Sequence, residues 1–139
     1  MFGRLSAINI SASGMSAERM RMEVVANNIA NAHTTMTESG EPYRRMNVVF
    51  SSTGAKSGDQ LGGVKVIGVE PDQTPFEWVH DPGHPHADAD GNVLLSNVRV
   101  PNEMVDLISA SRSYEANLRA ISLFREMVEE TLSLLNGGR

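Results

Sequence analysis

The chain of 139 residues has the length of one ordinary domain, carries a net charge of −5 and contains no cysteine. An acidic chain of this size gives no electrostatic reason to expect nucleic-acid binding, because that binding depends on Lys and Arg clustered on one face. Without cysteine, disulfides and thiol chemistry are excluded. The sequence also lacks GxSxG, a phosphate-binding loop and a dinucleotide fingerprint, so we expect neither an enzyme nor a cofactor.

No apolar run in the sequence approaches the roughly 20 residues that span a bilayer, so we expect no direct membrane insertion. The N-terminal stretch MFGRLSAINISASGMSAERM has no continuous apolar region of the secretory kind. We therefore expect any route out of the cytoplasm to be independent of a cleavable signal.

The N-terminal region, residues 1–35, has helical periodicity. Steps of three and four residues from Leu5 give a seam in which only one position is not apolar, which predicts a long helix. The seam consists of Leu5, Ile8, Ala12, Met15, Arg19, Met22, Ala26 and Ile29. Near its end stand Asn27, Asn28 and Asn31, and clustered asparagine is typical of a cap, a turn or a polar interface.

The C-terminal region, residues 101–139, has the same periodicity. Pro101 predicts the start of a helix, with Asn102 able to cap it and Glu103 facing the positive end of the helix dipole. Gly137 and Gly138 predict its end. The expected seam consists of Met104, Leu107, Ser111, Tyr114, Leu118, Ile121, Arg125, Val128, Leu132 and Leu135.

Between the two helices, residues 36–100 follow a period of two. YRRMNVVF and FEWVH alternate apolar and polar residues, and VKVIGVE is typical of a buried strand. Because glycine and proline separate these stretches without an intervening helix, we expect an antiparallel β-rich insert. Residues 53–63 predict a mobile loop. We interpret Arg44 and Arg45 as part of a solvated strand end.

The predicted fold class is α+β. Each terminal helix has an apolar stripe and too little core of its own to cover it, so we expect the two helices to pair as a coiled coil, parallel or antiparallel. Residues 1–35 and 101–139 would then form one joint element, from which the β-rich insert projects.

The segment DPGHPHADADGN, residues 81–92, allows two interpretations. Histidine and carboxylate side chains crowd into residues 80–90, and such a set can bind a transition metal. These side chains are His80, Asp81, His84, His86, Asp88 and Asp90. Their spacing matches no rigid ligand template, so we favour a turn whose backbone is set by Pro and Gly and bonded by the Asp side chains, with no metal.

The two ends of the chain resemble a known protein group. LSAINISASGMSAERMRMEVVANNIANAHTT and EMVDLISASRSYEANLRAISLFREMVEETL are similar to the ends of bacterial flagellar rod and hook proteins. GEPYRRMNVVF and DPGHPHADADGNV resemble the FlgC family of proximal rod proteins. The resemblance implies a structural subunit of the basal-body rod that is exported unfolded by the flagellar type III apparatus. Its terminal segments would become ordered on assembly in the periplasm-spanning rod, which transmits torque.

The resemblance implies that the partners are other rod and basal-body proteins and the export apparatus. We expect the assembly interface to lie on the two terminal helices and to include the asparagines, which would fix the register between subunits. The expected interface residues are Leu5, Ile8, Ala12, Met15, Met22, Ala26, Asn27, Asn28, Ile29, Asn31, Met104, Leu107, Tyr114, Glu115, Asn117, Leu118, Ile121, Val128 and Leu132. The alternative hypothesis is a soluble coiled-coil adaptor that binds a partner helix.

Overall fold

The computed structural model describes residues 2–53 and 62–137, with side chains from residue 7 onward. Helix α1 (Phe2–Ala30) is followed by strands β1 (Met46–Ser52), β2 (Val64–Pro71), β3 (Glu77–His80) and β4 (Asn92–Leu95), and helix α2 (Val100–Asn136) ends the fold. The two terminal helices and the antiparallel insert between them confirm the α+β prediction. The Leu5 side chain, Gly138 and most of the predicted mobile loop lie outside the described residues.

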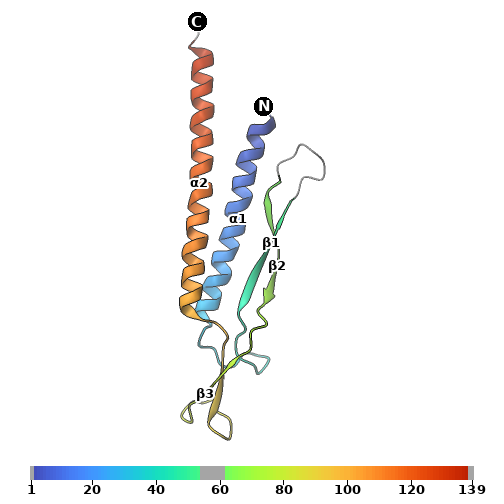
Figure 1. The fold of residues 1–139 in the computed structure, drawn as a ribbon, viewed down its shortest axis with the longest axis vertical. Helices are drawn as coiled ribbons and strands as arrows, with labels where there is room; N and C mark the ends of the chain where they lie inside the picture. Colours follow the sequence, from blue (N-terminus) through green and yellow to red (C-terminus); the bar gives the residue numbers. More distant parts are fainter. Residues whose placement is uncertain (1, 54–61, 138–139) are drawn as a thin grey trace.

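The two helices lie side by side and antiparallel, so both chain termini are at the same end of the molecule (Figure 1). Asn28 of α1 contacts Glu103 of α2, and Gly14 lies against Asn117 further along. Extending this register at equal rise along both helices leaves roughly the last seven residues of α2 beyond the start of α1. The upper end of α2 therefore has no neighbouring helix in the subunit (Figure 1).

The inward faces of the helices differ by about one residue from the predicted seams. In α1 the buried positions are Ala17, Val24, Val25 and Asn28, whereas Ala12 and Ala26 of the predicted seam are exposed. In α2 the buried positions are Glu103 and Ala110, and Met104, Leu118 and Leu132 are exposed. The predicted seams agree with the structure only in part: residues such as Met15, Leu107 and Ile121 are half-buried, whereas several other large apolar side chains of α2 lie outward.

The hairpin of β1 and β2 packs along α1 (Figure 1). The Oγ of Ser13 accepts a hydrogen bond from Val64 N at 3.0 Å and donates one to Ile10 O at 2.7 Å. A side chain at Gly63 would meet this hydroxyl, since a Cβ there would lie 2.4 Å from Ser13 Oγ. Along β2, half-buried residues alternate with exposed ones such as Ile67, so the prediction of a buried strand was wrong.

The second hairpin, β3 and β4, lies at the end of the molecule away from the chain termini. Strand β4 was not predicted, because four residues between Gly91 and Ser96 are too short to establish a period. Its Val93 is buried, whereas Val79, its partner on β3, is 39% exposed and Trp78 is 62% exposed. Helix α2 begins at Val100 after Arg99, two residues before the predicted cap Asn102, and the Arg99 side chain makes no capping bond.

Candidate functional site: a buried polar cluster at the base of the helix pair

The side chain of Asn28 is fully buried near the end of α1. Its Nδ2 donates to Met46 O and to Glu103 Oε2, both at 2.9 Å, and its Oδ1 accepts from Met46 N and from the Tyr43 hydroxyl, both at 3.0 Å. The amide thus pairs with both backbone groups of Met46 as a neighbouring strand would. All four hydrogen-bonding positions of the amide are used, and Asn28 fixes where β1 begins relative to both helices.

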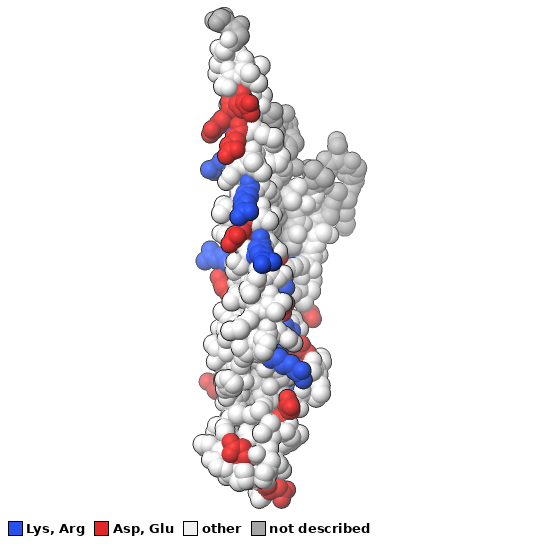
Figure 2. All heavy atoms as spheres, turned by 60° about the vertical axis from the view of Figure 1, so that its left-hand side comes forward, with Lys and Arg blue, Asp and Glu red and all other residues white. Residues whose placement is uncertain are grey.

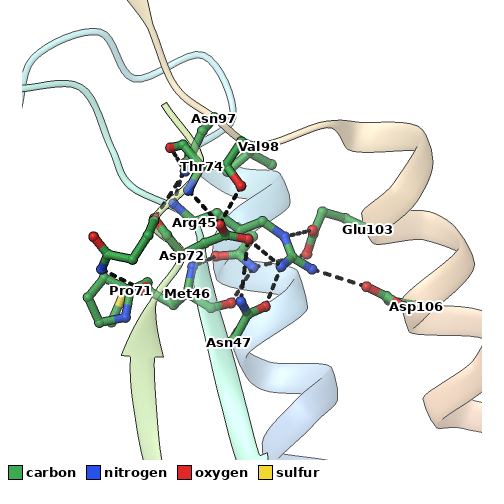
Figure 3. Close-up of polar contacts among 12 residues, drawn as sticks. Arg45, Met46, Asn47, Pro71, Asp72, Thr74, Asn97, Val98, Glu103 and Asp106 are labelled. Carbon is green, nitrogen blue, oxygen red and sulfur yellow. Dashed lines mark hydrogen bonds and ion pairs between the residues drawn. The ribbon is translucent and has the colours of Figure 1, made fainter. Parts of the chain in front are cut away.

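Arg45 extends its guanidinium from the start of β1 toward α2 and the turn after β2 (Figure 3). Its Nε donates to Glu103, whose side chain is 0% exposed. Its Nη1 donates to Asn47 and, at 3.1 Å, to Asp72, and its Nη2 donates to Asp106 at 3.1 Å. The planar fork of arginine suits several carboxylates at once, so one side chain joins three separate segments of the chain.

Asn97 and Arg44 complete the cluster from the other side. Asn97 Oδ1 accepts from Arg45 N at 2.7 Å, and its Nδ2 donates to Thr74 O at 2.9 Å. Arg44 donates to the carbonyl oxygens of Asp72 and Thr74 and lies 4.2 Å above the centre of the Phe76 ring. We call Asn28, Tyr43, Arg44, Arg45, Asn47, Asp72, Asn97, Glu103 and Asp106 the Arg45 cluster.

The cluster shifts the acidity of its members. Burial and the negative charge of Glu103 raise the pKa of Tyr43. Burial lowers the pKa of Arg45, but hydrogen bonds and charge from Glu103 and Asp72 outweigh burial, so the pKa is raised overall. Hydrogen bonds from the Thr74 side chain and backbone, with others from Arg45 and Asn47, lower the pKa of Asp72 to about 2. These shifts keep Arg45 charged, and Asp72 ionised at neutral pH.

Because the Asp72 pKa is lowered on folding, its carboxylate stabilises the fold fully only above the unfolded value of about 3.9. This contribution should decline as the pH falls from about 4 through about 2. We expect Asp72→Asn to have a lower free energy of unfolding than wild type at pH 6. This difference should shrink as the pH falls from about 4 to about 2. Urea unfolding of both proteins across a pH series measures the difference. A constant gap down to pH 2 would contradict this.

Sequence reasoning missed this cluster. Arg45 was interpreted as a solvated strand end, which was wrong, and Glu103 was assigned only to the helix dipole. One available signal was a carboxylate at a position where the helix must face its neighbour, one turn before Leu107. A second was the arginine directly before an alternating strand. For neither residue can the partner be named until the fold is known.

The segment that connects β3 to β4 has the turn structure favoured from its sequence. Asp81 Oδ1 accepts from Gly83 N, Asp88 Oδ1 accepts from the backbone N–H groups of Asp90 and Asn92, and Gly91 has a φ of 78°. His86 Nδ1 lies 2.8 Å from Thr35 Oγ1. Within residues 2–53 and 62–137, no group of three or more His, Asp or Glu is arranged to hold a metal ion.

We expect His84→Ala combined with His86→Ala to change the free energy of unfolding by no more than about 1 kcal/mol, because His86 is exposed and His84 is half-buried in a turn. We also expect wild type to show no saturable Zn²⁺, Ni²⁺ or Ca²⁺ binding tighter than roughly 10 μM. Calorimetric titration of both proteins tests this. A stoichiometric submicromolar site that the double variant loses would restore the metal interpretation.

Two family models match the chain. The flagella basal body rod protein model covers residues 8–35, and the model of the FlgEFG basal body rod C-terminal region covers residues 89–134. The flagellar basal-body rod protein FlgC of Salmonella typhimurium is 42% identical over 94% of this chain and 96% of its own length. The FlgC proteins of Borreliella burgdorferi, at 39% identity over 97% and 99%, and Bacillus subtilis, at 40% over 92% and 95%, are also similar.

The chain belongs to the FlgC family of flagellar basal-body rod proteins. It is a structural component of the basal-body rod and not an enzyme. The matched regions cover most of α1 and α2 and include Asn28 and Glu103 of the Arg45 cluster. No described helix is both long and apolar enough to cross a membrane.

The structure distributes the expected interface residues of this FlgC-family chain over three environments. Asn28 is buried inside the subunit. Half-buried residues are Ile8, Met15, Met22, Ile29, Asn31, Leu107, Tyr114, Asn117, Ile121 and Val128, and exposed residues are Ala12, Ala26, Asn27, Met104, Glu115, Leu118 and Leu132. Asn28 therefore bonds within the subunit, and the exposed members remain open to contact with other proteins.

Proposed function

We propose that the chain polymerises with neighbouring rod subunits through the outward faces of α1 and α2. One observation carries this proposal: α2 exposes large apolar side chains over most of its length. They are Met104, Val105, Ile108, Leu118, Leu123, Met127, Leu132, Leu134 and Leu135. A monomer rarely leaves so many large apolar side chains of one helix exposed, because their burial in an interface is favourable.

The surface of α2 supports the same proposal. In the view of Figure 2, uncharged surface runs along the helix between separate charged side chains. Acidic side chains gather toward the C-terminal part of the helix, where Glu126, Glu129 and Glu130 are exposed. The exposed apolar side chains of α2 lie among these charged ones, and an interface can combine both kinds, with apolar contacts in its core and charged groups at its rim.

The export route and the mechanical role follow from incorporation into the rod. We propose that the subunit reaches the rod through the flagellar type III export apparatus and that the assembled rod crosses the periplasm and transmits torque. Its partners would be other rod proteins and basal-body components. Membership of a rod family favours this function over the coiled-coil adaptor.

The test is a change that leaves the free subunit folded and removes an outward apolar contact. Leu118 is 47% exposed, so Leu118→Asp should change the free energy of unfolding by less than about 1 kcal/mol. In the assembled interface the same carboxylate would be buried without a partner, at a cost of several kcal/mol. Cells that make this variant should lack complete rods and should not swim.

Ile67→Asp is the matched control, because Ile67 is also an exposed apolar residue but belongs to β2 and not to a helix. We expect cells that make it to assemble rods and swim. Electron microscopy of isolated basal bodies and a motility assay measure both variants. Normal rods with Leu118→Asp would contradict an interface at this part of α2, and defective rods with Ile67→Asp alone would assign assembly to the hairpin.

A further inference from the structure

The contacts between α1 and α2 are unequal along the helix pair. Every described side-chain hydrogen bond or ion pair between the two helices is made by Glu103 or Asp106 of α2. The other fully buried residue of α2 is Ala110, and no described residue of α2 after it is buried. The strong contacts are therefore confined to the first turns of α2.

Among the described residues, the upper part of the pair has no fully buried contact between the helices. Gly14 of α1 faces Asn117, and Ser13 bonds to Val64 of β2 and not to α2. Large apolar side chains in this part are only half-buried, such as Ile8, Met15 and Ile121. Small residues bury little apolar area, and glycine lowers the helix propensity of the stretch. Helical segments without tertiary packing are marginally stable in water, so the two helices can separate here at low cost.

The lower part is connected to the β1–β2 hairpin as well. Glu103 bonds to Asn28 of α1 and to Arg45 before β1, and Arg45 bonds in turn to Asp72 after β2. Opening the lower part would leave the buried groups of three segments without partners, which costs far more than separating half-buried side chains.

We propose that the Arg45 cluster is a clasp that keeps residues 17–28 and 100–114 closed against each other in the free subunit, while the helix pair above them opens. The clasp limits the terminal disorder expected for the free subunit to the upper parts of α1 and α2. The opened part of α2 includes its end beyond the start of α1 and the exposed Leu123, Met127 and Leu134. These residues would be free to pack against neighbouring subunits. This last step rests on the proposed function, whereas the clasp itself does not.

Hydrogen exchange followed by mass spectrometry on the purified monomer tests the clasp. In wild type, amides of residues 104–112 should exchange at least about tenfold more slowly than amides of residues 124–134. In Glu103→Gln, which keeps the side-chain shape and removes the charge, exchange of residues 104–112 should rise at least about tenfold, with residues 124–134 unchanged. Glu115→Gln, an exposed change on the same helix, should match wild type.

Three results would overturn the clasp: equal protection along all of α2, equally fast exchange along all of α2, or a gradient that Glu103→Gln leaves intact. Exchange of β2 amides reports whether Glu103→Gln still folds. If Glu103→Gln does not fold, Arg45→Lys replaces it as the test variant, because lysine keeps the charge but cannot bond several carboxylates as a fork. A rise in exchange confined to residues 104–112 would then support the clasp, and no such rise would contradict it. None of these readouts depends on rod assembly, so the clasp and the proposed function can fail separately.

Discussion

Glu103→Ala is expected to lower the free energy of unfolding by about 3–5 kcal/mol, the usual cost of breaking a buried ion pair. The change removes the carboxylate that Arg45 and Asn28 both contact, so the guanidinium loses its one fully buried partner and keeps only the partly exposed Asp72 and Asp106 as carboxylate partners. Urea unfolding followed by circular dichroism measures the loss. Glu115→Ala is the control, since Glu115 is exposed on the same helix, and should cost less than about 0.5 kcal/mol.

The paired change Arg45→Met with Glu103→Met separates the cost of leaving Arg45 without Glu103 from the value of the ion pair itself. Two apolar side chains of similar length leave no unpaired charge, so the double variant should be more stable than Glu103→Ala. Asp72 and Asp106 also lose Arg45 as a partner, but both are partly exposed and remain hydrated. A loss below about 1 kcal/mol for Glu103→Ala would show that the cluster does not hold the subunit together.

Asn28→Leu is expected to lower the free energy of unfolding by about 2–4 kcal/mol. The change leaves the N–H and C=O of Met46 and the Tyr43 hydroxyl without their partners, and each buried unsatisfied group costs about 1–3 kcal/mol. Leucine restores part of this loss by burying apolar surface. The same urea unfolding experiment measures the effect.

Asn27→Leu is the matched control for Asn28, because Asn27 is the adjacent residue and its side chain is exposed. We expect a change within about 0.5 kcal/mol. Equal losses at the two positions would contradict the special role of Asn28 and would indicate a general effect of asparagine at the end of the helix.

The helices and the antiparallel insert could be predicted because their periods are long and punctuated by Gly and Pro. The residues with which each helix faces the other could be predicted only in part. A search for apolar seams selects Met104, Leu118 and Leu132, which the subunit exposes, and passes over Glu103, Ala110 and Asn117, which face α1. In a chain that assembles, the most apolar stripe of a helix need not face its own partner helix. Coiled-coil pairing of the two helices stays a prediction.

The three asparagines of ANNIANA illustrate the same difficulty. The prediction of a polar interface or a turn at the helix end fits all three, yet their roles differ. Asn28 binds the start of β1, Asn31 donates to Asn27 O and accepts from Thr34 in the turn after α1, and the Asn27 side chain is exposed. Sequence alone cannot separate these roles, because the partners of Asn28 lie 15 to 75 residues away.

The most direct test of the account is subunit-resolved imaging of the chain in isolated basal bodies. We predict that the chain occupies the rod, that Leu118, Leu123 and Met127 are covered by neighbouring subunits, and that Asn28, Arg45 and Glu103 keep their mutual contacts. A rod in which these three apolar side chains of α2 face solvent, or from which the chain is absent, would contradict the account.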